Sequence, residues 1–280
     1  MRALVSGVVG GLAAGAAMRL LRAHPPGGAA RWERTNHAGA TVTLLEGPAY
    51  AAGAAAGAAL LGAGPGPVLA TTAAAGLGAL DDLRGDSGSK GLKGHLGALA
   101  RGEVTTGAVK IVGLAVTGVC AAALVDLRVR RDARHGRHGT RPRGIPAVAD
   151  TIVGGAVVAG TANLFNLLDL RPGRALKAVV LVGALAATSD GSAVAAGAAA
   201  GAAASLLPPD LAGEAMLGDT GANAAGALLG TALLQRTGRR GRLVALALLT
   251  GLTLASEKVS FTQVIESTPV LRELDALGRR

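Results

Sequence analysis

Four aspartates lie where uncharged, apolar runs of the sequence begin or end. Asp81 and Asp82 end the run GLGALDD, Asp169 ends NLFNLLD, and Asp219 opens LGDTGANAAG. Two apolar segments separate Asp82 from Asp169, and two more separate Asp169 from Asp219. If each segment crosses a bilayer, the even count returns all four carboxylates to one face of the membrane. Carboxylates gathered in this way could hold Mg²⁺ against phosphate groups.

The pair Asp81 and Asp82 follows the C-terminal end of an expected helix, where the helix dipole disfavours negative charge. Adjacent carboxylates repel each other unless cations neutralise them, and Mg²⁺, Arg84 or Lys90 could do so. A solvated pair of loop acids is the alternative. Lys110 lies one or two turns inside the next apolar segment. Because a lysine inside a membrane is costly unless it is paired, we expect it to meet a lipid phosphate or a carboxylate.

Polar residues recur at three-residue spacing in the segment TANLFNLLDLRPGR, as Asn163, Asn166 and Asp169. Residues three apart share a helix face, so two amides and a carboxylate would project together. Amides both donate and accept hydrogen bonds, which suits recognition of a uracil ring or a ribose. Arg171 and Arg174 follow and could clamp a diphosphate. The alternatives are contacts between helices for the amides and snorkelling to the interface for the arginines.

Asp219 taken alone is explained by capping of the helix that follows it. Its position on the same face as the other acids is what favours a metal ligand. The histidines show no ligand spacing and no arrangement for serine or cysteine catalysis. They are His24, His37, His95, His135 and His138.

The elements that must position these residues are apolar and rich in small side chains. The chain is 50% hydrophobic, with a mean hydropathy of +0.44. Residues 47–80 carry no charge, and residues 178–209 carry only Asp190. Such lengths match membrane spans better than the core helices of a soluble protein, although a soluble, Ala-rich helical protein is the alternative. Glycine pairs at four-residue spacing, such as Gly197 and Gly201, favour close helix contacts in lipid.

The sequence therefore predicts one integral membrane domain over residues 1–280, an all-α polytopic bundle of about eight to ten transmembrane helices. The N-terminal apolar run is interpreted as an uncleaved first span. Four polar stretches (22–47, 81–103, 169–174 and 208–220) and the tail from Ser256 then fall on one side. The expected spans are residues 3–21, 48–63, 67–80, 104–125, 146–168, 175–188, 192–207, 221–235 and 242–255.

The net charge of +10 is distributed over short loops. Binding of nucleic acid needs a continuous basic surface, usually with stacking aromatics, and the chain has only four aromatic residues. Attraction to anionic membrane lipid explains the charge more simply. Because both sides carry similar numbers of arginines and lysines, the positive-inside rule does not fix the orientation.

Taken together, the motifs resemble those of the polyprenyl-phosphate N-acetylhexosamine-1-phosphate transferases, the membrane superfamily that includes phospho-N-acetylmuramoyl-pentapeptide translocase. The matches span most of the chain in the order of that family. They are RTNHAGATVTLLEGPA (34–49), GLGALDDLRGD (76–86), TTGAVK (105–110), NLFNLLDLRPGRALK (163–177) and LGDTGANAAGALLG (217–230).

The resemblance implies a multi-pass enzyme of the bacterial cell membrane that works in cell-envelope polymer synthesis. Such an enzyme transfers a sugar 1-phosphate from a UDP-sugar to a polyprenyl phosphate at the cytoplasmic face, with Mg²⁺, and releases UMP. By resemblance, Asp219 would bind the metal, and Asp81 and Asp82 would serve the metal and the lipid phosphate, one of them as a base. Asn166 and Asp169 would hold the uridine, and Lys110 would contact phosphate. The expected partners are UDP-sugar, polyprenyl phosphate and membrane lipid; a homodimer is left open.

Two features depart from the family pattern. Pro172 stands where a second aspartate usually follows three residues after Asp169, and no histidine follows His138, where the family often clusters histidines. Both favour the alternative of a catalytically degenerate relative that binds carrier lipid or scaffolds other envelope proteins. A small transporter is a third interpretation, which would explain Lys110 but not the acids on one face.

Overall fold

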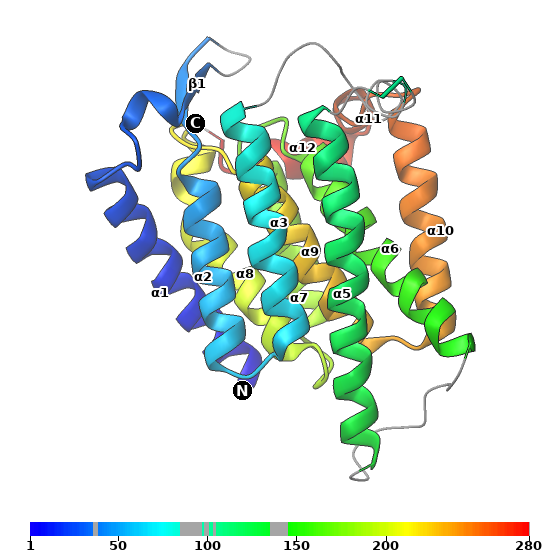
Figure 1. Ribbon diagram of the computed structural model, residues 1–280. Helices are drawn as coiled ribbons and strands as arrows, with labels where there is room; N and C mark the ends of the chain where they lie inside the picture. Colours follow the sequence, from blue (N-terminus) through cyan, green and yellow to red (C-terminus); the bar gives the residue numbers. More distant parts are fainter. Residues whose placement is uncertain (36–38, 85–96, 98–100, 103–104, 135–144, 280) are drawn as a thin grey trace.

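The structure, a computed structural model, describes residues 1–35, 39–84, 97, 101–102, 105–134 and 145–279. Within this part of the chain, nine long helices run between the two ends of a bundle (Figure 1). Each of the nine expected spans corresponds to one helix, with ends shifted by up to four residues, except that the helix expected at residues 104–125 continues to Arg134. The helices are α1 Arg2–Ala23, α2 Glu46–Leu60, α3 Pro65–Arg84, α5 Thr106–Arg134, α6 Ile145–Leu168, α7 Arg174–Ala186, α8 Ala193–Leu211, α9 Gly218–Arg236 and α10 Arg239–Ser256.

Several helices have the length and composition of membrane spans. α1, α5, α6 and α8 are long and apolar enough to cross a membrane, and α10 adds a fifth if it forms one bent span with α11, Phe261–Ser267. Large apolar side chains such as Leu12, Val116 and Ile152 are more than half exposed on the outside of the bundle. Such exposure is costly in water but not in lipid. The helices are thus compatible with the expected multi-pass membrane protein.

α9 is the central helix of the bundle. It contacts α2, α3, α5, α6, α7 and α8, and nearly all of its residues are buried. The sequence permits this because no charged residue lies between Asp219 and Arg236. A helix without a polar face can be covered on every side. Asp219, in its first turn, is thereby held at one end of the bundle, the end that also carries the C-terminal segment in Figure 1.

Glycines let the helices approach closely, as their spacing predicts. A Cβ atom at Gly201 of α8 would overlap the backbone of Gly7 in α1, and a Cβ at Gly197 would overlap Ala3. The same kind of contact matters for the site, because a Cβ at Gly78 of α3 would overlap the carbonyl oxygen of Asp219. Only a glycine at position 78 lets the end of α3 lie directly against the start of α9.

A short hairpin covers the same end of the bundle, where the sequence predicted only helices and loops. Strand β1, Glu33–Thr35, pairs antiparallel with β2, Thr41–Thr43. The β-branched run Thr-Val-Thr suits an extended backbone. Thr43 also exchanges backbone hydrogen bonds with the loop before α9, donating to Glu214 at 3.1 Å and accepting from Met216 at 3.0 Å. The hairpin is thus joined to the loop that leads into α9.

A buried ion network lies at the opposite end of α5, α6 and α10. Arg242, which is fully buried, donates to Asp126 at 2.6 Å and to Asp150 at 3.2 Å. Arg242 closely follows Arg236, Arg239 and Arg240 in the sequence. Its charge is neutralised inside the protein, so it is not part of a basic loop surface.

Candidate functional site

Asp81, Asp82, Asp169 and Asp219 line one cavity. This acid cavity has a volume of about 520 Å³ and lies at the end of the bundle that carries the hairpin. Asp81 and Asp82 reach it from the last turn of α3, Asp169 from the residue after α6, and Asp219 from the first turn of α9. The four carboxylates, which are far apart in the sequence, thus meet at a single place in the fold.

Lys110 joins two of these acids. Its ammonium nitrogen lies 2.7 Å from Oδ2 of Asp81 and also contacts Oδ2 of Asp219. The three side chains are each about one fifth exposed, so the ion pairs are only partly screened by solvent. The sequence predicted that Lys110 would meet a phosphate or a carboxylate, and in this structure its partners are two carboxylates.

Asp82 has a different local role. Its Oδ1 accepts the backbone N–H of Asp219 at 3.0 Å, and its Oδ2 accepts the backbone N–H and the hydroxyl of Thr220 at 2.9 and 2.6 Å. The first N–H groups of a helix have no partner within that helix, and a carboxylate there also complements the helix dipole. Asp82, a residue of α3, therefore caps the N-terminus of α9. Asp219, which the alternative interpretation made the capping residue, instead donates its own backbone N–H to Asp82.

The acids fit Mg²⁺ in their chemistry. Mg²⁺ prefers oxygen ligands and needs only one or two carboxylates, because it keeps several waters. Asp81 and Asp219 supply two carboxylates, and Oδ2 of Asp169 is buried without a hydrogen-bond partner among the described residues. As they lie, no three Asp, Glu, His or Cys side chains in the described ranges are grouped closely enough to hold a metal. A metal bound by Asp81 and Asp219 would take the place of the Lys110 ammonium.

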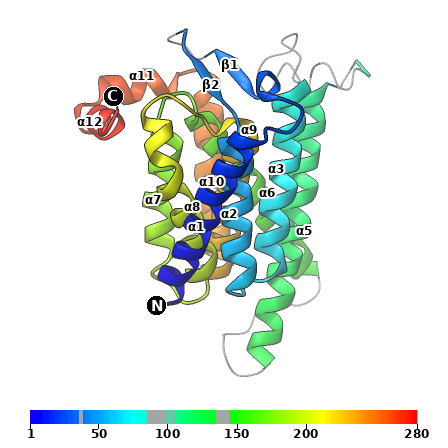
Figure 2. The ribbon, with the colours of Figure 1, turned by 90° about the vertical axis from the view of Figure 1, so that its left-hand side faces the viewer.

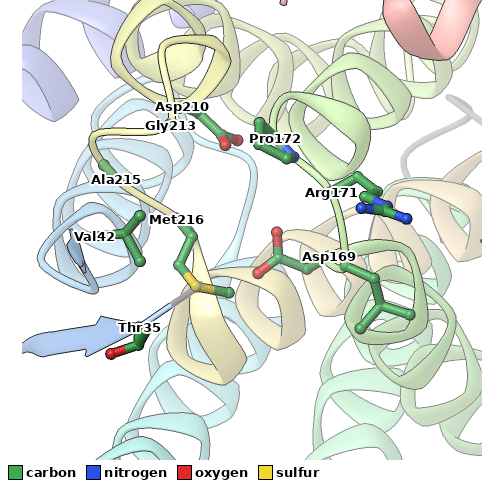
Figure 3. Close-up of a pocket in the computed structure, with 10 residues that line it drawn as sticks. Thr35, Val42, Asp169, Arg171, Pro172, Asp210, Gly213, Ala215 and Met216 are labelled. Atoms are coloured by element: carbon green, nitrogen blue, oxygen red, sulfur yellow. The ribbon is translucent and has the colours of Figure 1, made fainter. Parts of the chain in front are cut away.

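A smaller space, the side cavity, adjoins the acid cavity. It measures about 260 Å³, and both cavities are lined by Thr35, Asp169, Leu170 and Met216. Figure 3 shows the carboxylate of Asp169 pointing into the side cavity. Burial raises the pKa of Asp169 well above its usual value, and the nearby charge of Asp210 raises it further. Asp169 thus lies where the two cavities meet, in a position to accept hydrogen bonds from a ligand.

Asp210 is a site residue that the sequence analysis missed. It comes from the last turn of α8, is 2% exposed, and lines the side cavity on the side away from Asp169 (Figure 3). Its Oδ1 accepts the N–H of Gly173 at 3.1 Å, while its buried Oδ2 has no partner among the described residues. Asp210 also ends an uncharged run, so the criterion that singled out the other four aspartates would have found it.

Three polar residues of the predicted nucleotide segment have partners outside these cavities. Asn163 donates to Thr253 of α10 at 3.4 Å, as the helix-contact alternative predicts. Arg174 is buried in a two-pronged pair with Asp275 at 2.7 and 2.9 Å. Arg171 lines the side cavity but points away from it in Figure 3 and pairs with Glu266 at 3.2 Å. The expected clamp of Arg171 and Arg174 on a diphosphate is therefore not formed here, because both arginines have carboxylate partners in the C-terminal tail.

Asn166, in contrast, lines the acid cavity as expected. Arg34 of the hairpin also reaches that cavity, where its guanidinium donates to the carbonyl oxygen of Asp82. Arg34 has no predicted site role, because the sequence does not predict the hairpin that carries it. Several residues named in the sequence analysis lie outside the described part of the chain, namely Lys90, His37, His95, His135 and His138.

Comparison with known proteins finds no family model that matches this chain, and no curated protein matches it either.

Proposed function

We propose that the protein is a phosphoglycosyl transferase of the bacterial cell membrane, which uses Mg²⁺ to move a sugar 1-phosphate from a UDP-sugar to a polyprenyl phosphate. The observation that carries the proposal is the convergence of Asp81, Asp219 and Lys110 on one cavity at the end of an apolar helical bundle. Carboxylates for a metal and a cation for phosphate are what a diphosphate substrate requires. The proposed setting is cell-envelope polymer synthesis at the cytoplasmic face.

In the proposed reaction, a phosphate oxygen of the lipid attacks the phosphorus that carries the sugar. A new P–O–P linkage forms to the lipid, the bond from this phosphorus to the oxygen of UMP breaks, and UMP leaves with the electron pair. Mg²⁺, when bound, would neutralise the diphosphate and the charge that develops on the departing UMP. Asp81 and Asp219 would hold the metal, which leaves Lys110 free to turn toward a phosphate of either substrate.

The two cavities suggest how the nucleotide would be held. With the diphosphate in the acid cavity, the nucleoside would extend past Asn166 and Asp169 into the side cavity. The unpartnered oxygens of Asp169 and Asp210 are hydrogen-bond acceptors, and a ribose or a uracil imide offers the donors that they lack. Asp210 lies on the same side of this cavity as Pro172 (Figure 3), so it provides a carboxylate from α8 where the α6–α7 segment has a proline.

The alternative function is that of a degenerate relative which binds carrier lipid or scaffolds other proteins. It is favoured by Pro172 and by the Lys110 ammonium, which occupies the space between the two acids. This alternative predicts that the ion bridge is permanent and that Mg²⁺ does not compete with it.

The test supplies the purified protein with polyprenyl phosphate, Mg²⁺ and a panel of UDP-sugars, and measures the release of UMP. We expect UMP with at least one sugar, and its loss in the isosteric variants Asp81→Asn and Asp219→Asn. Asp190→Asn, which changes an exposed acid at the other end of the bundle, is the matched control and should keep full activity. Release of UMP from none of the sugars would favour the scaffold function, and unchanged turnover in both site variants would refute the assigned site.

A further inference from the structure

The C-terminal segment leaves the direction of the bundle abruptly. α11 turns by 92° from α10, and a second short helix, α12 (Pro269–Ala276), follows it. Both lie at the end of the bundle that holds the acid cavity, and in Figure 2 they project sideways beyond α7. A segment in this position extends over the surroundings of the bundle and not over its core.

One side of α12 is fixed to α7 by polar contacts. Asp275, the buried residue of α12, pairs with Arg174 and with Arg279. Lys177 donates to the carbonyl oxygens of Leu274 at 2.9 Å and of Leu277 at 3.1 Å, which are among the last carbonyls of the helix. These contacts satisfy the C-terminal end of α12 and set the rotation of the helix about its own axis.

The apolar side of α12 is left uncovered by this attachment. Val270, Leu274 and Leu277 are 67, 55 and 66% exposed, and Leu271 beside them is exposed as well. At about 100° per residue these side chains fall on one flank of the helix, next to the face that carries Asp275. Ala276 falls on the other flank. α12 thus contacts α7 through polar groups and exposes its apolar side chains. A helix that packs on a soluble protein does the reverse: it buries its apolar side chains and exposes its polar ones.

The surroundings of the segment identify what covers the apolar flank. The exposed apolar surface of α10, which includes Leu248 and Leu252, leads directly into the bend, and α10 with α11 is long and apolar enough to count as one bent membrane span. A helix that runs sideways from the end of such a span lies at the level of the lipid head groups. An amphipathic helix at that level buries its apolar side at the boundary of the acyl chains.

We propose that α11 and α12 form an interfacial membrane anchor, in which Val270, Leu271, Leu274 and Leu277 enter the lipid at the site end of the bundle. The anchor is connected to the side cavity. Arg279 donates to the carbonyl oxygen of Pro172 at 2.9 Å, and Glu266 accepts from Arg171 at 3.2 Å. Insertion of α12 into the lipid would therefore also restrain residues 171–172, which line one wall of the side cavity. The proposal requires a bilayer around the helices and does not depend on the transferase activity.

The test places a fluorophore on each flank of α12 in the full-length protein. In a Cys120→Ser background, Leu274→Cys and Ala276→Cys are labelled with an environment-sensitive dye and reconstituted into vesicles of phosphatidylethanolamine and phosphatidylglycerol. One set of vesicles contains lipid with a nitroxide near the head group, and iodide is the quencher in water. Both positions are exposed, so neither substitution disturbs the core.

We expect the label at position 274 to emit at shorter wavelength and to be quenched several-fold more by the nitroxide lipid than by iodide. The label at position 276 should show the opposite preference. Equal access of iodide to both labels would refute the anchor, because α12 would then lie in water. Shielding of position 274 from both quenchers would also refute it, because the apolar flank would then be covered by protein, such as a second copy of this chain.

Discussion

The ammonium of Lys110 lies 2.7 Å from Asp81, and the same group contacts Asp219, so one cation joins the end of α3 to the start of α9. Without this cation, two carboxylates would face each other in a partly desolvated cavity and repel. Lys110 therefore stabilises the unliganded arrangement of the acids, and a divalent cation would have to replace it.

The first prediction concerns this replacement. Lys110→Met should lower the free energy of unfolding by up to about 3 kcal/mol without Mg²⁺, because it leaves both acids without their partner. Mg²⁺ should then raise the melting temperature of the variant more than that of the wild type, because it no longer competes with a lysine. Thermal unfolding in detergent, with and without Mg²⁺, measures both effects. Lys258→Met, at an exposed position, is the control; equal Mg²⁺ shifts in Lys110→Met and wild type would show that the lysine and the metal do not share a place.

The contact between Gly78 and Asp219 gives a second prediction. Gly78→Ala should destabilise the protein by about 1–3 kcal/mol or more, because the new methyl group meets a backbone oxygen that cannot move alone. It should also abolish UMP release, since it separates Asp81 and Asp82 from α9. Gly76→Ala is the matched control on the same helix, where a Cβ has open space, and it should stabilise by about 0.5–1 kcal/mol. Similar melting temperatures for the two variants would contradict the close packing of α3 on α9.

Asp169 allows a prediction about pH. Its pKa is raised in the folded protein, so the folded state keeps a proton that the unfolded chain releases above about pH 4. The contribution of Asp169 to stability is therefore fully present below that pH and is lost as the pH rises toward the raised pKa. Asp169→Asn, which does not titrate, should be more stable than the wild type at pH 8, by about 1.4 kcal/mol for each unit of pKa shift, and nearly equal to it at pH 4.

Melting curves across this range, together with UMP binding, check the prediction for Asp169. The same substitution should weaken binding of UMP, so stability and binding should move in opposite directions. A difference in stability that is independent of pH would show that the carboxyl group of Asp169 is not held in its protonated form.

A fourth prediction assigns Asp210 to the side cavity. Asp210→Asn keeps an acceptor for the N–H of Gly173 but replaces the charged oxygen that faces the cavity. We expect UMP to bind about tenfold more weakly, the effect of one hydrogen bond to a charged group, with little change for a polyprenyl phosphate. Titration calorimetry of the two ligands makes the comparison, with Asp190→Asn as the control. Equal loss of both ligands would indicate a change in the fold and not in the nucleotide cavity.

The tail provides the last prediction. Arg174→Met leaves Asp275 buried without its main partner, which should cost about 3–5 kcal/mol of docking free energy. α12 should then detach, and trypsin should cleave at the exposed Arg272 much faster than in the wild type. Arg171→Met removes an exposed ion pair of the same tail and should have an effect of about 0–1 kcal/mol. If the two variants were cleaved at the same rate, the buried pair would not be what holds the tail.

The sequence by itself determined the helices and the end of the bundle at which the acids meet. Uncharged runs of Ala, Gly, Val and Leu predict helices in an apolar environment, and counting those runs assigns Asp81, Asp82, Asp169 and Asp219 to one end. Both inferences are local or topological, because they need only the order of segments along the chain. The prediction that small residues lie at helix contacts also needs only their spacing along one helix. It is confirmed at Gly197 and Gly201, which lie against the backbone of α1.

Only the tertiary structure decided which side chains face one another within that end. Lys110 pairs with acids 29 and 109 residues away, Asp210 enters the side cavity from α8, and Arg174 turns from the nucleotide segment to Asp275 in the tail. Helix rotation and tail docking set these partners, and neither follows from the spacing of residues along one helix. A charge in a desolvated cavity pairs with the nearest opposite charge in space, and that neighbour exists only once the helices have packed.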